Sequence, residues 1–156
     1  GYKKPQMDEH HKIAFNATYG ESKLNKNDGY NTGFVYTTES SDTDPTTVVS
    51  VFGGFAGMGF RLGGEYDILT KGSEESNIIS VSANYTVKDN IDIFARYDMV
   101  DDNDEINKNG KNYLISGLVL TCEGGISIVP NLRILNYENT EKDVEMDYKV
   151  NFQFKF

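Results

Sequence analysis

The last segment of the chain alternates apolar and polar side chains without interruption. In a strand running from Val144 to Phe156, one face would be wholly apolar and the other wholly polar. The apolar residues are Val144, Met146, Tyr148, Val150, Phe152, Phe154 and Phe156. Strands in soluble sheets usually run about 5–6 residues, whereas a tilted strand that crosses a bilayer needs about 9–11. The length of this segment therefore favours a membrane-spanning strand whose apolar side chains face lipid.

The same two-residue period recurs along the rest of the chain. The clearest segments are 13–19, 60–68, 79–87 and 91–99, and the weaker ones are 30–38, 46–54, 111–122 and 126–137. In the segment 111–122 both faces are apolar, so the pattern does not assign a lipid side. With no segment of helical period, we expect about nine strands. The predicted fold is all-β: an antiparallel, up-and-down transmembrane barrel with a polar lumen and an apolar outer belt.

The expected connections support this prediction. Counted back from the C-terminus they are 138–143, 123–125, 100–110, 88–90 and 70–76, which alternate between longer and shorter. Outer-membrane barrels have short periplasmic turns and longer external loops. The alternation therefore predicts that Phe156 lies at the periplasmic rim.

Strand number leaves the domain organisation open. Residues 1–156 are expected to form a single barrel domain, but bacterial single-chain barrels close with an even number of strands. Eight strands from Tyr30 onward would close a small barrel, and residues 1–29 would then be an N-terminal arm, a plug or an additional strand. Alternatively, Gly1 lies within a longer protein and the chain is the C-terminal part of a larger barrel. Because no export signal is recognisable at Gly1, we expect any such signal to have been removed or not included.

Composition excludes several other classes of protein. The chain has 15 Lys and Arg against 24 Asp and Glu, a formal charge of −9, which argues against a nucleic-acid partner. The longest uncharged stretch, 45–60, is too short and too rich in Thr and Gly for a transmembrane helix, which needs about 20 apolar residues. Cys122 is the single cysteine, so neither a disulfide framework nor a cysteine-based zinc cluster is expected.

If the apolar positions face lipid, the charged strand residues between them point inward. These proposed lumen residues are Arg61, Glu65, Asp67, Asp92, Arg96, Asp98, Arg133, Glu145, Asp147 and Lys149. A Lys or Arg side chain facing hydrocarbon at mid-membrane would cost about 2–4 kcal/mol. One interpretation is a pore lining that sets solute selectivity. The other is a cross-strand salt-bridge network that fills the narrow interior of an eight-stranded barrel. The mixed signs predict no ion preference.

Neither catalysis nor a bound cofactor or metal ion is expected. The two histidines, His10 and His11, are adjacent, and neighbouring residues on a strand point opposite ways. No strand offers a histidine near a serine and an acid, as a His-assisted hydrolase would need. The acidic segment 101–105 is followed by Ile106, where a calcium-binding EF-hand loop needs Gly, and it is interpreted as a solvated external loop.

Three segments resemble a known family. The alternation ending at Phe156 resembles the C-terminal signal by which outer-membrane proteins are recognised by the barrel-assembly machinery. The segment 91–98 (IDIFARYD), followed by an acidic loop, is similar to the late strands of general and phosphate-selective-type porins, and so is 128–133 (IVPNLR). Such porins have about 16 strands. Either the chain is a fragment of such a protein, or the resemblance is limited to the sequence pattern of individual strands and does not extend to the whole protein.

The resemblance implies a monomeric or trimeric channel for passive diffusion of small hydrophilic solutes or ions through the bacterial outer membrane. Its expected partners are outer-membrane lipids, the barrel-assembly machinery, small solutes and, in a trimer, further copies of the chain. Two alternatives remain. One is a small, non-conducting structural or adhesive barrel, and the other is a soluble lipocalin-like barrel with its apolar side chains inside. Strand number separates the first from a channel, and solubility without detergent identifies the second.

Overall fold

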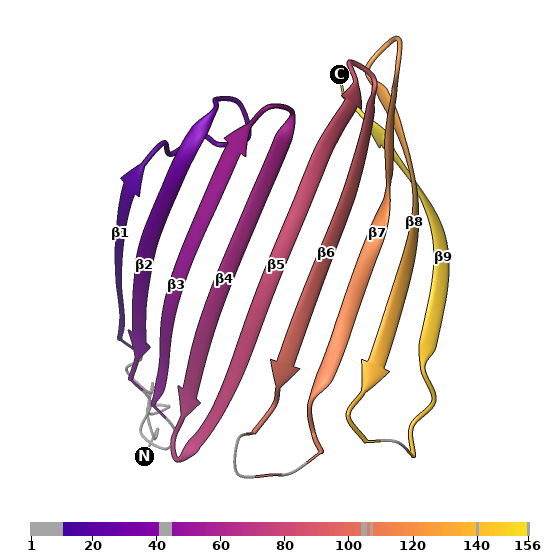
Figure 1. The fold of residues 1–156 in the computed structure, drawn as a ribbon. Helices are drawn as coiled ribbons and strands as arrows, with labels where there is room; N and C mark the ends of the chain where they lie inside the picture. Colours follow the sequence, from indigo (N-terminus) through magenta and orange to yellow (C-terminus); the bar gives the residue numbers. More distant parts are fainter. Residues whose placement is uncertain (1–10, 41–44, 104–105, 107, 140, 156) are drawn as a thin grey trace, which may run out of the picture.

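Nine β-strands make up the described part of the chain. The computed structural model describes residues 11–40, 45–103, 106, 108–139 and 141–155. The strands are β1 (Lys12–Gly20), β2 (Gly29–Glu39), β3 (Thr46–Gly57), β4 (Phe60–Lys71), β5 (Glu74–Lys88), β6 (Ile91–Asp101), β7 (Lys111–Cys122), β8 (Ile126–Tyr137) and β9 (Glu145–Phe154). Each pairs antiparallel with its neighbours in sequence, in the order β1 to β9 (Figure 1). The prediction of an all-β, antiparallel, up-and-down sheet is confirmed.

The sheet is open. Among the described residues β1 pairs with β2 alone and β9 with β8 alone, and Figure 1 shows β1 and β9 at opposite edges. The closure expected of a complete barrel is therefore not found. The segment Lys12–Gly20 is an additional strand that occupies the edge of β2, the edge an eight-stranded barrel would have needed for closure. Because nine is odd, β1 and β9 point the same way, and joining them directly would give a parallel pair.

The register between strands sorts the side chains onto two faces. Directly opposed residues share a face, so Tyr66 on β4 lies level with Val51 on β3 and Ile79 on β5. Extended across the sheet, one face carries the odd-numbered residues of β1, β3, β5 and β6 and the even-numbered residues of β2, β4, β7, β8 and β9. We call this the apolar face and the opposite one the mixed face. Charged residues of the described strands reach the apolar face only near strand ends, as with Glu75 and Asp101.

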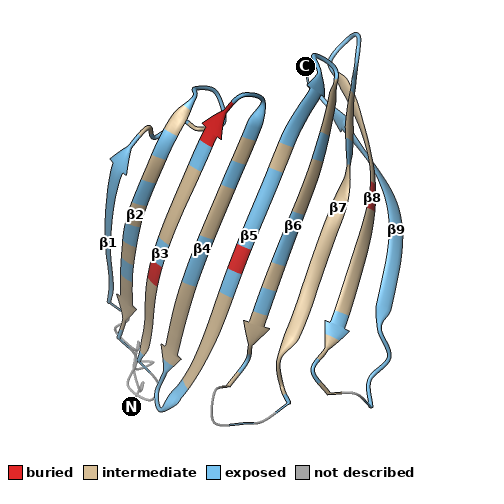
Figure 2. Ribbon diagram, viewed as in Figure 1, coloured by how far each residue is buried: buried red, intermediate tan, exposed pale blue. Residues whose placement is uncertain are grey.

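Burial in this sheet is the reverse of that in a water-soluble one. Large apolar side chains are exposed across the apolar face, with Phe15 57% and Phe152 61% exposed. Examples from eight strands are Phe15, Phe34, Phe55, Leu62, Val81, Ile93, Leu118, Val150 and Phe152. The buried residues that carry side chains, Ser50, Ala56, Ser80 and Asn131, lie on the mixed face, which is therefore the more enclosed one; Gly57, at the end of β3, is buried on the other face. Figure 2 shows β1 and β9 exposed along their whole lengths.

The connections differ from the predicted alternation at two places. The predicted longer loop 70–76 is a tight turn at 72–73, because β4 and β5 continue their pairing to Lys71 and Glu74. At the opposite end of the sheet, where the turns 58–59, 89–90 and 123–125 are short, the connection 21–28 is longer. The turn at 58–59 has φ of 54° at Met58 and 81° at Gly59. Positive φ at both central residues matches the twist of an antiparallel hairpin.

Gly33 on β2 lies directly opposite Phe52 on β3, on the mixed face. A Cβ at Gly33 would overlap the Phe52 ring and come within 2.8 Å of the Ala17 carbonyl oxygen. The absence of a side chain on β2 at this point is what lets the Phe52 ring lie across the sheet. Gly53, the next residue on β3, lies on the apolar face, where the nearest atom to an added Cβ is 3.5 Å away.

We therefore expect Gly33→Ala to lower the free energy of unfolding by about 1–3 kcal/mol, the usual cost of overpacking. The matched control Gly53→Ala should change it by less than about 0.5 kcal/mol. Urea titration of both variants, in the medium in which the chain folds, measures the difference. Equal changes in the two variants would contradict the packing of Phe52 over Gly33.

Candidate functional site

The ten charged residues predicted to point inward lie on one face of the sheet. Three of them are on β4, three on β6, one on β8 and three on β9. The register between the strands places all ten on the mixed face. They are Arg61, Glu65, Asp67; Asp92, Arg96, Asp98; Arg133; and Glu145, Asp147, Lys149. The structure thus gathers these residues from segments far apart in the sequence onto one surface, the candidate functional site.

At the centre of this surface Asp98 is held by two neighbours. Its Oδ1 accepts hydrogen bonds from the Ser80 hydroxyl on the adjacent strand and from Arg96 Nε at 2.8 Å, and its Oδ2 accepts from the same Nε at 3.0 Å. The Asp98 side chain is 14% exposed and that of Arg96 55%. The arginine charge is therefore balanced locally while its guanidinium remains accessible to water.

Two further carboxylates lie on the same face of β4. Glu65 and Asp67 are two residues apart and stand opposite Ser80 and Ile78 of β5. The Oδ1 atom of Asp67 is buried and has no hydrogen-bond partner among the described residues. Buried polar atoms in folded proteins are normally satisfied by protein or by ordered water. Since the described residues leave Asp67 Oδ1 without a hydrogen-bond partner, this part of the mixed face favours hydration over a dry salt-bridge network.

Asn131 is a functional residue of this face that the sequence patterns missed. Its amide donates to the Val129 carbonyl at 2.9 Å, the Lys149 carbonyl at 3.4 Å and Asn151 Oδ1 at 3.1 Å. Its own Oδ1 accepts from Arg133 Nε at 3.0 Å. It follows Pro130, which has no N–H and sits where the β7–β8 pairing is interrupted. A proline inside an otherwise regular strand was the available signal for a side chain that bridges strands here.

Arg133 and Asp147 stand directly opposite each other, yet each has a nearer partner. Arg133 donates to Asn131, whereas Asp147 forms an ion pair with Lys149 at 3.2 Å on its own strand. The Asp147 side chain is 64% exposed, so this pair contributes little to stability. The charges at this end of the mixed face are thus solvent-facing.

Arg61, on the predicted face, also contacts a backbone connection. Its guanidinium Nη1 donates to the backbone carbonyl of Leu24 and, at 3.4 Å, to that of Asn27. Both carbonyls belong to the connection between β1 and β2. Arg61 therefore holds a backbone segment against the mixed face.

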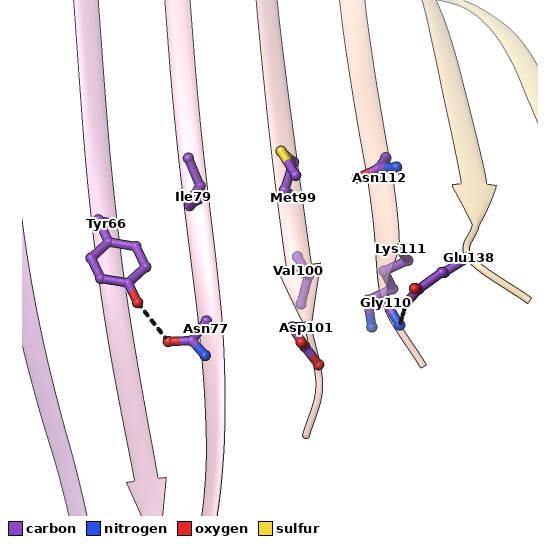
Figure 3. Close-up of a pocket in the computed structure, with 10 residues that line it drawn as sticks. All are labelled: Tyr66, Asn77, Ile79, Met99, Val100, Asp101, Gly110, Lys111, Asn112 and Glu138. Atoms are coloured by element: carbon purple, nitrogen blue, oxygen red, sulfur yellow. Dashed lines mark hydrogen bonds between the residues drawn. The ribbon is translucent and has the colours of Figure 1, made fainter. Parts of the chain in front are cut away.

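The apolar face ends sharply near the connection 102–110. A pocket of about 490 Å³ lies at this border. Ile79 and Met99 are among its apolar lining residues (Figure 3). The Tyr66 hydroxyl donates to Asn77 Oδ1 at 2.9 Å, and polar groups such as Asp101 line the rest. Within two residues along β5 and β6 the face changes from apolar to polar. Between Ile91 and Met99 the apolar positions of β6 span a length within the roughly 9–11 residues of a membrane-crossing strand.

Aromatic rings mark the opposite border of the apolar face. Phe60 and Tyr85 have ring centroids 4.4 Å apart, and Tyr19 and Tyr30 have centroids 6.5 Å apart. All four lie near strand ends on the side of the short turns. Aromatic residues are enriched in this position at membrane–water interfaces.

The other predicted residues are placed as follows. Met146, Tyr148, Val150, Phe152 and Phe154 lie on the apolar face of β9, Val144 precedes that strand, and Phe156 lies outside the described residues, as do His10 and positions 104–105 of the acidic loop. Within the described ranges, no group of three or more His, Cys, Asp or Glu side chains could hold a metal ion. The same part of the chain contains no helix long and apolar enough to cross a membrane.

Comparison of the chain with protein-family models, with curated proteins and with solved structures found no match.

The contacts of Asn131 predict a loss of stability on Asn131→Ala. Removing its side chain leaves the Val129 carbonyl and Arg133 Nε without their partner, at a cost of about 1–3 kcal/mol. For a domain of this size that cost lowers the melting temperature by roughly 2–4 °C per kcal/mol. Asn151→Ala, which removes one of the acceptors of Asn131, is the control and should cost less. A thermal melt in which both variants behave like the wild type would contradict the bridging role of Asn131.

Proposed function

We propose that this chain forms part of the wall of a transmembrane β-barrel in the bacterial outer membrane. In this proposal the apolar face meets lipid and the mixed face lines a water-filled passage for passive diffusion of small hydrophilic solutes or ions. The observation that carries it is the apolar face, which has exposed large apolar side chains on eight of the nine strands while the charged residues collect on the opposite face.

Hydrophobic free energy supports a lipid environment for this face. Burying apolar surface stabilises a protein by about 25 cal/mol per Å², and soluble monomers rarely expose contiguous apolar patches beyond a few hundred Å². Side chains such as Phe55, Leu62 and Val81 are 41%, 45% and 49% exposed without forming any core. A lipocalin-like barrel would place these residues inside, whereas here the enclosed face carries Ser50, Ser80 and Asn131.

The open edges support a barrel larger than eight strands. Unpaired strand edges are not tolerated in hydrocarbon, so β1 and β9 require partners in the membrane. Because β1 and β9 run in the same direction, antiparallel closure needs an odd number of additional strands between them. Barrels of about eight strands are filled by side chains, and larger ones leave an aqueous channel. A barrel with more strands than the nine of this chain is favoured to be a channel over a non-conducting structural barrel.

The mixed face suits water and small polar solutes. It offers carboxylates, guanidinium groups and amides from four or more strands, including Glu65, Arg96, Asn131 and Lys149. The charges are of both signs, which gives selectivity by local fields without a single ion preference. The alternating β9 would also present the C-terminal signal to the barrel-assembly machinery. No step of this function is chemical, and the proposed protein is not an enzyme.

Two neighbouring residues of β5 test the proposal. Ser82 lies on the mixed face and Ala83 on the apolar face, and both are exposed in the structure. In a Cys122→Ser background, Ser82→Cys and Ala83→Cys are introduced into the complete barrel, which supplies the strands that β1 and β9 lack. The barrel is refolded into phospholipid vesicles and treated with a charged, membrane-impermeant maleimide. We expect labelling of the first variant to be at least about tenfold faster, because hydrocarbon excludes water and prevents ionisation of the thiol.

The other outcomes distinguish the alternatives. Slow labelling at both positions would indicate a filled, non-conducting interior. A chain that stays in the aqueous fraction without detergent, with Ala83→Cys protected and Ser82→Cys open, would support a soluble barrel. Fast labelling at both positions in vesicles would contradict the lipid contact of the apolar face.

A further inference from the structure

The connection 21–28 has a compact structure of its own. Glu21 Oε1 accepts a hydrogen bond from the Lys23 amide at 2.8 Å. The Lys23 carbonyl in turn accepts from the amides of Lys26 and Asn27 at 2.8 and 2.9 Å. The neighbouring hairpin at 58–59 needs a two-residue turn to join its strands, so this connection contains more chain than a hairpin requires.

Side chains of the sheet hold this segment on the mixed face. Arg61 on β4 donates to the carbonyls of Leu24 and Asn27, and Asn31 Nδ2 on β2 donates to the Glu21 carbonyl at 3.0 Å. The Leu24 side chain lies over Gly54 on β3, where an added Cβ would come 2.8 Å from Leu24 Cδ1. The segment is therefore fastened to β2, β3 and β4 at once.

Leu24 reaches far across the sheet. It borders two hollows of about 310 and 340 Å³, and both are also lined by Ser82 on β5 and Arg96 on β6. The first hollow also includes Glu65, and the second includes Phe94. The segment thus overhangs the part of the mixed face that carries the central charged residues.

From this placement we infer that residues 21–28 narrow the passage at the short-turn end of the barrel, with Arg61 as the residue that positions them. The inference rests on the proposed function and adds the element that sets the upper size of the permeating solutes. The half-buried Leu24 side chain lies beside the charged side chains of Glu65 and Arg96. The narrow part of the passage would therefore have an apolar side chain on one side and charged side chains on the other. In this arrangement Arg61 is a positioning residue and does not itself select charge.

Trypsin tests the fastening without any measurement of permeation. The segment contains two trypsin sites, Lys23 and Lys26. Cleavage of a native-state segment follows the population of its open form. Hydrogen bonds from a charged donor contribute enough that Arg61→Gln should raise the rate of cleavage after these lysines about tenfold. Lys111→Gln, which removes a cation that pairs with Asp102 at the opposite end of the sheet, is the control and should leave the rate unchanged.

A second pair of variants leaves Arg61 intact. Gly54→Ala forces Leu24 from its position and should also raise cleavage after Lys23 and Lys26. Gly64→Ala adds the same methyl group to the apolar face of β4, where the nearest atom is 3.9 Å away, and should have no effect. Cleavage rates that do not differ between either variant and its control would overturn the fastening.

Swelling of vesicles in sugars of increasing size then tests the narrowing, with the complete barrel, including the strands that close β1 to β9, in the vesicles. Arg61→Gln and Gly54→Ala should raise the swelling rate in the largest sugar severalfold relative to the smallest, and their controls should not. Faster proteolysis with an unchanged size dependence would overturn the narrowing while leaving the fastening intact. If wild-type vesicles admit no sugar at all, the proposed diffusion function fails, and with it the narrowing; the trypsin result still decides the fastening.

Discussion

The register between neighbouring strands is the constraint on which the rest of this structure depends. A slip of one residue in a hairpin would exchange the two faces of every strand beyond it. The observed register instead keeps Tyr66 level with Val51 and Ile79, and it keeps the charged residues of β4, β6, β8 and β9 together. An exposed apolar face and an enclosed face rich in charge are both consequences of that alignment. The sheet is therefore organised as an inside-out version of a soluble one.

The two faces obey different packing rules. On the apolar face, Ser116 is a polar residue in the middle of β7. At the border of this face the Tyr66 hydroxyl meets Asn77. On the mixed face, polar side chains bridge strands: Asn131 joins β8 to β9, and Asp98 joins β6 to β5. Arg61 likewise joins a strand to a connection, because it donates hydrogen bonds to backbone carbonyls of the segment 21–28. Polar contacts thus shape the enclosed face.

Local periodicity was sufficient to predict the strands and the residues of each face wherever apolar and polar residues alternate cleanly. It failed for Lys111–Cys122, because Tyr113 and Ile115 are apolar on the mixed face; the pairing with β6 and β8 assigns its faces. The turn at 72–73 was missed because polar residues extend both strands past the apolar pattern. The role of Arg61 could not be predicted, since it depends on how the segment 21–28 folds back over β3. The open edges at β1 and β9 depend on how all nine strands pair, so the sequence of a single segment does not predict them.

The central claim is that one face of the sheet meets lipid and the other meets water, and the chain contains no tryptophan to obscure an optical test of it. Adjacent positions in the central strand β6 sample the two faces, Ile93 the apolar one and Phe94 the mixed one. Single-tryptophan variants at these positions, refolded into vesicles whose acyl chains carry bromine, report direct contact with lipid by fluorescence quenching. The account predicts strong quenching for Ile93→Trp and weak quenching for Phe94→Trp. Equal quenching at both positions, or stronger quenching at Phe94→Trp, would contradict it.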